Sequence, residues 1–270
     1  MLGKLMKYEF KACGRIFFPL YLGILLLAAI NGVNLGANLK NETVDGFPMD
    51  PSALNTQTIL SMILVALFVA LFVITIVLTI QRFKKNLLDD EGYLMFTLPV
   101  KSSNLILSKF FVALIYGITS VIVALLSFFI IGAIGGDFNI SDFLYVFTEQ
   151  SIFTEGEAFI IYMILGLLID YSIFVLTIYL ALSIGQLPQL SKYRVAAGVV
   201  LFFLINLLIS NIQNFVGNNL LGEAIQLEAT TNLTATTISY MLVSLLLSVV
   251  IGVILFLSTN WLLNKKLNLE

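Results

Sequence analysis

Six long apolar stretches constrain the fold of this chain more than any other feature. A helix needs about 20 mostly apolar residues to cross the roughly 30 Å of hydrocarbon in a bilayer. Stretches of that length lie at residues 17–36, 58–80, 104–134, 158–184, 195–213 and 238–262. Charged residues make up only 11% of the chain, whereas soluble domains carry about 25%. We therefore predict an all-α integral membrane protein with six transmembrane helices in a single domain, residues 1–270.

The positions of Lys and Arg predict which side of the membrane each loop faces. Cytoplasmic loops carry an excess of these residues. When the N-terminus is placed inside, thirteen of the fourteen basic residues fall on the cytoplasmic side, and only Lys40 lies outside. Most acidic residues sort the opposite way. We therefore expect both termini to be cytoplasmic.

Several classes of function are excluded by what the sequence lacks. The net charge is -2, so no basic surface for nucleic acid is expected. The chain has no histidine and only one cysteine, Cys13, which excludes metal sites built on those residues and catalytic groups that need histidine. It also lacks a Gly-x-x-x-x-Gly-Lys-Ser/Thr motif for binding nucleotide phosphates. We expect no enzyme activity, catalytic residue, metal or cofactor in this chain.

Two cytoplasmic segments have helical or apolar character without being spans. In residues 1–16, apolar residues recur at helical spacing opposite a stripe of Lys and Arg, which predicts an amphipathic helix in the inner membrane interface. Its role is either to anchor the first span or to contact a cytoplasmic partner. The loop at 81–103 is too charged to span, yet its centre at 93–98 is strongly apolar. We expect this centre to be buried, either as a short helix on the membrane or against another protein.

This loop carries a resemblance to a known family. The run from Arg82 to Leu87, the run from Asp90 to Val100, and the pair Ser108-Lys109 resemble the intracellular loop of bacterial type-2 ABC exporter permeases, especially short ones from Gram-positive bacteria. The six-span layout and the basic amphipathic N-terminus are similar as well. Only the loop is motif-like.

The resemblance implies partners and site residues. In that family the loop contains a coupling helix that sits in a groove of a separate ATPase, and the N-terminal helix is a connecting helix beside it. ATP and Mg would be bound by that ATPase, and a second permease, identical or related, would complete the transporter. The residues implied to face the ATPase are Asp90, Glu91, Tyr93, Leu94, Met95 and Phe96.

One acidic residue, Asp170, lies deep in a predicted span. An ionised carboxylate there costs about 2.5 to 3.5 kcal/mol on insertion scales, so it is expected to face protein or water. It is either a contact for a cationic substrate or a proton, or a hydrogen-bonding group between helices.

Polar residues also mark the fifth span and the segment after it. Asn206, Ser210 and Gln213 share one helical face, which predicts a cleft or a dimer seam, and the resemblance slightly favours the seam. The outer segment at 214–237 mixes apolar residues with glycine and acids, which is typical of re-entrant or interfacial helices.

Two functions fit these observations. The first is the permease subunit of an ATP-driven transporter in the bacterial plasma membrane, exporting a hydrophobic or amphipathic substrate such as a peptide antibiotic, a drug or a lipid. The second is an ion-coupled secondary transporter, which usually needs several intramembrane charges and broken helices. Membrane lipids surround the chain in either case.

Overall fold

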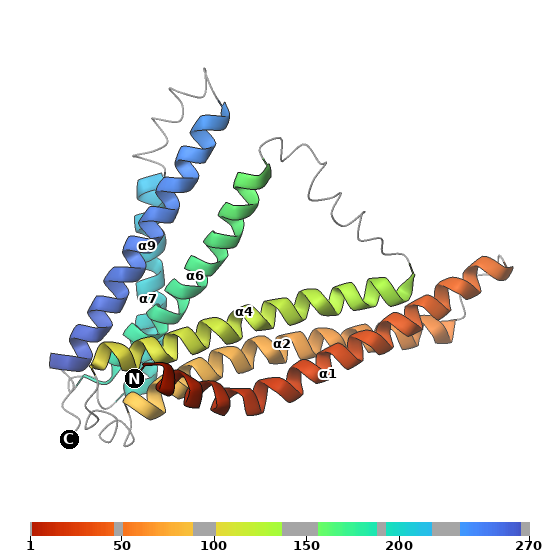
Figure 1. The fold of residues 1–270 in the computed structure, drawn as a ribbon, viewed down its shortest axis with the longest axis horizontal. Helices are drawn as coiled ribbons and strands as arrows, with labels where there is room; N and C mark the ends of the chain where they lie inside the picture. Colours follow the sequence, from red (N-terminus) through yellow and green to blue (C-terminus); the bar gives the residue numbers. More distant parts are fainter. Residues whose placement is uncertain are drawn as a thin grey trace. The chain divides into compact units, whose positions relative to one another are not determined.

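Six long helices make up the part of the chain that the structure describes. The computed structural model describes residues 2–45, 51–88, 101–136, 156–187, 193–217 and 233–265. The helices are α1 (Leu2–Asp45), α2 (Pro51–Leu87), α4 (Ser102–Gly135), α6 (Gly156–Gly185), α7 (Arg194–Phe215) and α9 (Leu233–Lys265) (Figure 1). No β-strand occurs within these ranges.

The six predicted spans are confirmed as helices long and apolar enough to cross a membrane. The qualifying parts are Leu2–Asn38, Thr56–Leu87, Ser102–Gly135, Tyr162–Gly185, Arg194–Phe215 and Met241–Asn264. Each one contains most or all of the predicted stretch, because long apolar runs without interior breaks continue as helix until polar or glycine-rich sequence follows. The side of the membrane that each helix end faces stays a prediction.

The amphipathic helix predicted at residues 1–16 is continuous with the first span in the structure. Residues 2–16 form the first turns of α1, which is 44 residues long and passes through Pro19. Cys13 and Phe17 are buried in the same core cluster, so packing is continuous across the expected boundary. Because one buried face continues across that boundary, a break in the helix there would lose packing and backbone hydrogen bonds. Whether its first turns lie in the membrane interface stays a prediction.

The helices form two compact units. The N-terminal unit contains Met6–Leu78 and Val112–Ser151, and so holds most of α1, α2 and α4. The C-terminal unit contains Ile152–Glu270, with α6, α7 and α9, together with Met1–Leu5 and Thr79–Phe111. Helices α2 and α4 therefore each contribute one end to the C-terminal unit and the rest to the N-terminal unit.

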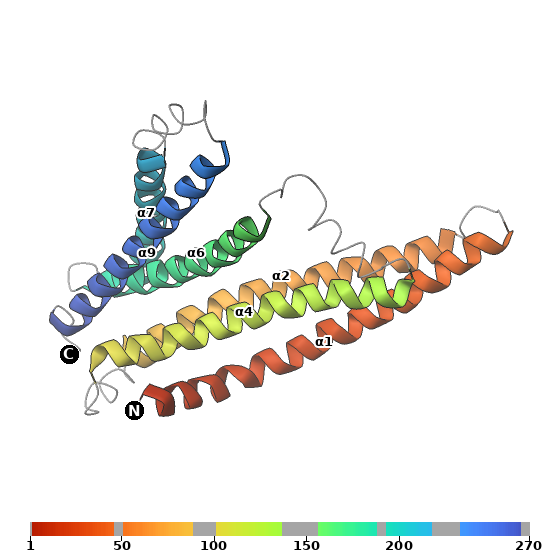
Figure 2. The ribbon, with the colours of Figure 1, turned by 45° about the horizontal axis from the view of Figure 1, so that its top comes forward.

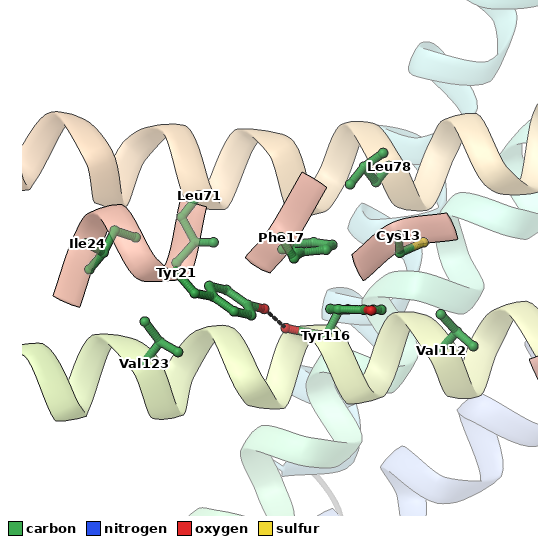
Figure 3. Close-up of a cluster of buried hydrophobic side chains, with 9 residues drawn as sticks. All are labelled: Cys13, Phe17, Tyr21, Ile24, Leu71, Leu78, Val112, Tyr116 and Val123. Atoms are coloured by element: carbon green, nitrogen blue, oxygen red, sulfur yellow. Dashed lines mark hydrogen bonds between the residues drawn. The ribbon is translucent and has the colours of Figure 1, made fainter. Parts of the chain in front are cut away.

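Aromatic rings form the centre of the N-terminal unit. Tyr116 of α4 stacks on Phe10 and Phe17 of α1, with ring centroids 4.9 and 4.5 Å apart. The Tyr116 hydroxyl donates to the carbonyl oxygen of Phe10 at 2.7 Å, and Tyr21 reaches the carbonyl oxygen of Tyr116 (Figure 3). Leu71 and Leu78 of α2 complete the same cluster. Stacked rings and buried hydroxyl bonds thus hold α1 against α4.

Glycines let α1 and α4 approach closely at their C-terminal ends. A Cβ added to Gly32 would lie 3.1 Å from the backbone oxygen of Ile131, and one added to Gly36 would lie 3.1 Å from that of Ile134. Contact at Gly32 with Ile131, and at Tyr21 with Tyr116, means that the two helices run parallel. The Gly-x-x-x-Gly spacing of α1 is typical of close packing between transmembrane helices.

Helix α6 is the central helix of the C-terminal unit, because it packs against both α7 and α9. Figure 2 shows the three helices together. Its second half is buried on nearly every side, from Ile173 to Gly185. A Cβ on Gly185 would lie 2.9 Å from the carbonyl oxygen of Arg194, so only glycine lets α7 begin at this position. A helix that is covered on all sides is expected to lack an amphipathic pattern. This explains why apolar residues occur on every face of the second half of α6.

Candidate functional site

The predicted coupling loop is described only at its two ends. The residues implied to face an ATPase, Asp90, Glu91, Tyr93, Leu94, Met95 and Phe96, lie outside the described residues. Its described ends are residues 81–88, which include the last turns of α2, and residues 101–103, where α4 begins at Ser102. The structure therefore shows how the loop is attached, and its contact residues stay predictions.

The incoming end of the loop is packed into the C-terminal unit. Phe83 is fully buried, and its ring stacks on Tyr179 of α6 with centroids 4.1 Å apart and planes 10° from parallel. Leu87 and Leu88 are buried as well. These contacts fasten the end of α2 to the cytoplasmic half of α6, by the predicted orientation.

The outgoing end is fastened in the same unit. The Ser102 hydroxyl donates to the side-chain oxygen of Asn264 in α9 at 2.6 Å. Leu105 and Ile106 are buried, and Lys109 is only 3% exposed. A lysine buried to that extent is unusual unless its ammonium group has a partner, and Lys109 does have an interaction. Both ends of the loop thus connect to helices of the C-terminal unit.

Asp170 is placed on the exposed surface of α6. No hydrogen bond or ion pair joins its carboxylate to another residue of the described ranges. Met163 and Leu167, on the same side of the helix at helical spacing, are exposed too. The described chain holds no partner for this group, so both interpretations of Asp170 stay predictions.

The polar residues of α7 do not converge on one point. The Asn206 amide donates to the carbonyl oxygen of Phe202 in the preceding turn, at 2.8 Å. Gln213 reaches across to the Ser248 hydroxyl of α9 at 3.4 Å, while Ser210 is exposed. The three residues are therefore spread along the helix, and each has different surroundings. The cleft or seam predicted from them stays a prediction, and most of the outer segment at 214–237 lies outside the described residues.

Sequence reasoning missed two polar groupings inside the N-terminal unit. Tyr21 of α1 bonds Thr119 and Ser120 of α4 at 3.0 and 2.9 Å. Gln57 of α2 donates to the side-chain oxygen of Asn31 in α1 at 2.8 Å. The available signal was the occurrence of amide and hydroxyl side chains within apolar runs, since such groups seek partners on neighbouring helices.

The candidate site gains no further residues from metal-ligand clusters or from similarity to other proteins. Within the described ranges, no three His, Cys, Asp or Glu side chains lie together as metal ligands would. Comparisons of the chain with protein-family models, curated proteins and solved structures found no match. The functional argument therefore depends on the loop, its attachment and the polar residues of the spans.

Proposed function

We propose that this chain is the membrane-spanning permease subunit of an ATP-driven ABC transporter, with ATP hydrolysed by a separate cytoplasmic subunit. The observation that carries the proposal is the attachment of the loop at 81–103. Phe83 is stacked on Tyr179, and Ser102 is bonded to Asn264. A partner bound to the loop would thereby hold α6 and α9 as well as α2 and α4.

This attachment suits the transmission of a rigid-body movement. Packed helices respond to a displacement as a body, because well-packed interfaces move between discrete arrangements rather than deforming. Helices α2 and α4 continue from the loop into the N-terminal unit without interruption. A push on the loop would reach both units through these two helices. A loop tethered only by flexible chain could not act in this way.

The remaining parts of the proposal come from the sequence. The chain lacks a phosphate-binding motif of its own, so the energy source is placed on another subunit. The resemblance of the loop adds a second permease copy or a related permease, the bacterial plasma membrane as location, and export as direction. A hydrophobic or amphipathic substrate, such as a peptide antibiotic, a drug or a lipid, would be compatible with a transport pathway between spans whose side chains are mostly apolar.

Purification of the full chain with its partner tests the proposal. The tagged chain is isolated in mild detergent from its native cell, and co-purifying proteins are identified by mass spectrometry. We expect a soluble ATPase in stoichiometric amount, and its loss when 93–96 are all replaced by serine. The matched control replaces Phe143, Leu144, Tyr145 and Phe147 of the predicted outer loop by serine, and the ATPase should then be retained. A chain that purifies alone, or equal loss in both variants, would contradict the proposal.

Charge reversal at Asp90 and Glu91 refines the test. Replacing both by lysine should reduce the permease-stimulated ATPase activity at least tenfold while the amount of inserted protein is unchanged, because acidic side chains on the loop would pair with basic groups of the ATPase. Unchanged stimulation would remove these two residues from the contact.

The ion-coupled secondary transporter is the second candidate. Asp170 favours it, because an exposed carboxylate within a span, unpaired within the described residues, is the kind of group that binds a proton or cation. Transport by the isolated chain in proteoliposomes under an ion gradient, without ATP, would establish this function. Transport only with ATP and the partner subunit would exclude it.

Cysteine labelling tests the proposed orientation. Lys40→Cys should react with a membrane-impermeant reagent added to intact cells, and Lys192→Cys only after the cells are opened. Both are placed in the Cys13→Ser background, which removes the native thiol. The reverse pattern of labelling would overturn the orientation and with it the cytoplasmic placement of the loop.

A further inference from the structure

A polar cluster lies between α1 and α2 within otherwise apolar sequence. Asn31 is only 2% exposed, and its side-chain oxygen accepts the hydrogen bond from Gln57. Asn34 follows one turn later on the same side of α1, since residues three apart share a helix face. Gly32 and Gly36 face α4, roughly two fifths of a turn away from the two asparagines. Helix α1 thus presents the Asn31 amide to α2 and small residues to α4.

Two atoms of this cluster are buried without a hydrogen-bond partner. They are the amide nitrogen of Asn34 (Nδ2) and the amide oxygen of Gln57 (Oε1). A buried polar atom without a partner destabilises the folded state, so native proteins rarely leave two together. One atom is a donor and the other an acceptor. The two are complementary to a single group that both accepts and donates.

We propose that Asn34 and Gln57 form a binding site for one hydroxyl group, whose oxygen accepts from Asn34 Nδ2 and whose hydrogen is donated to Gln57 Oε1. The hydroxyl belongs either to a water molecule or to the head group of a membrane lipid. Both have the same hydrogen-bonding chemistry, and the site lies at the end of α1 and the start of α2, where each span ends.

The spacing of the residues supports this assignment. Gln57 is bonded to Asn31, and Asn34 lies three residues further along the same helix. Side chains three apart on a helix are separated by about 5 to 6 Å between Cβ atoms. Two consecutive hydrogen bonds of about 2.8 Å through one oxygen join atoms roughly 4.5 to 5.5 Å apart. The structure has no direct hydrogen bond between Asn34 Nδ2 and Gln57 Oε1, and one hydroxyl could bridge two atoms at such a separation.

Ordered water in cores occurs at sites of this chemistry. Buried waters typically bond two to four polar groups that would otherwise be unpaired, whereas apolar cavities stay dry. The hydrogen bond from Gln57 to Asn31 holds the Gln57 side chain in place, so its oxygen Oε1 is already positioned before a hydroxyl binds. The bound hydroxyl would join α1 to α2 in the way that Tyr21 joins α1 to α4.

A high-resolution structure of the full chain tests the proposal directly. The chain is purified with its lipids and, separately, after delipidation, and is crystallised with an antibody fragment. Density within hydrogen-bond distance of both atoms in the two preparations identifies water. Density lost on delipidation and regained with phosphatidylglycerol identifies a lipid hydroxyl. An empty site in both preparations, or a direct bond between Asn34 and Gln57 below 3.5 Å, overturns the proposal.

The direction in which Asn34→Leu changes the Tm provides the second test. Asn34→Leu keeps the side-chain size but removes the donor, so it should expel the hydroxyl, strand Gln57 Oε1 and lower the Tm in detergent by about 2 to 4 °C. If the donor has no ligand, the same substitution removes an unpaired buried group and raises the Tm instead. Asn38→Leu, one turn further along, is the matched control and should change the Tm by less than about 1 °C.

Discussion

Removing the ring of Phe83 tests whether the loop end is fastened to α6. The ring is completely buried and lies 4.1 Å from Tyr179, nearly parallel to it. Phe→Ala in a core costs about 3 to 5 kcal/mol, of which the ring pair supplies about 0.5 to 1.5 kcal/mol. We expect Phe83→Ala to lower the free energy of unfolding by about 3 kcal/mol, the lower end, because lipid or detergent is itself apolar.

The assay is the thermal unfolding of the purified chain in one fixed detergent. With about 2 to 4 °C of Tm per kcal/mol for a chain of this size class, the expected fall is roughly 6 to 12 °C. Phe72→Ala provides the control, since Phe72 lies on the same helix but is 64% exposed, and its Tm should change by no more than about 1 to 2 °C. Phe83→Leu should retain part of the stability, because it keeps most of the buried volume. Equal shifts for Phe83→Ala and Phe72→Ala would refute the reasoning.

Three further substitutions test other contacts. Tyr21→Phe removes the hydroxyl that joins α1 to α4 and should cost about 1 to 2 kcal/mol in chemical unfolding, whereas Tyr8→Phe, at a residue that is 73% exposed, should be neutral; equal effects would contradict the role of the hydroxyl. Gly185→Ala brings a methyl group within 2.9 Å of a backbone oxygen and should lower the Tm by several degrees, while Gly166→Ala on the same helix meets nothing within 4 Å and should not; a harmless Gly185→Ala would show that α7 can shift. Asp170→Asn should reduce transport at least tenfold with assembly intact if the carboxylate contacts substrate or proton; loss of assembly alone would support the helix-packing interpretation.

The positions of the spans could be predicted because their signal is local. A helix that crosses hydrocarbon must satisfy its own backbone bonds and carry apolar side chains over its whole length. The stretch predicted at 195–213 thus became Arg194–Phe215, and the one at 104–134 became Ser102–Gly135. Neither boundary required knowledge of which helix lies beside which.

The side-chain contacts between helices could not be predicted, because they depend on packing between helices that are far apart in sequence. Nothing near Tyr21 indicates that its hydroxyl meets Ser120, 99 residues later. Gln213 was placed on a shared polar face with Asn206, yet in the structure it bonds Ser248. The packing of the first turns of α1 is of the same kind, since Phe10 and Phe17 stack on Tyr116 of α4, about 100 residues later.

The length of α1 has a further consequence for how the two sides of the membrane communicate. Its 44 residues extend about 66 Å at 1.5 Å per residue, roughly twice the thickness of the hydrocarbon. Even when strongly tilted, such a rod projects into water at one end or both. Because α1 is continuous, a displacement of either projecting end is passed along the helix without any loop in between, and Pro19, which lacks one backbone hydrogen bond, is where it bends most easily. A molecule that binds on one side could therefore be sensed on the other through α1 alone.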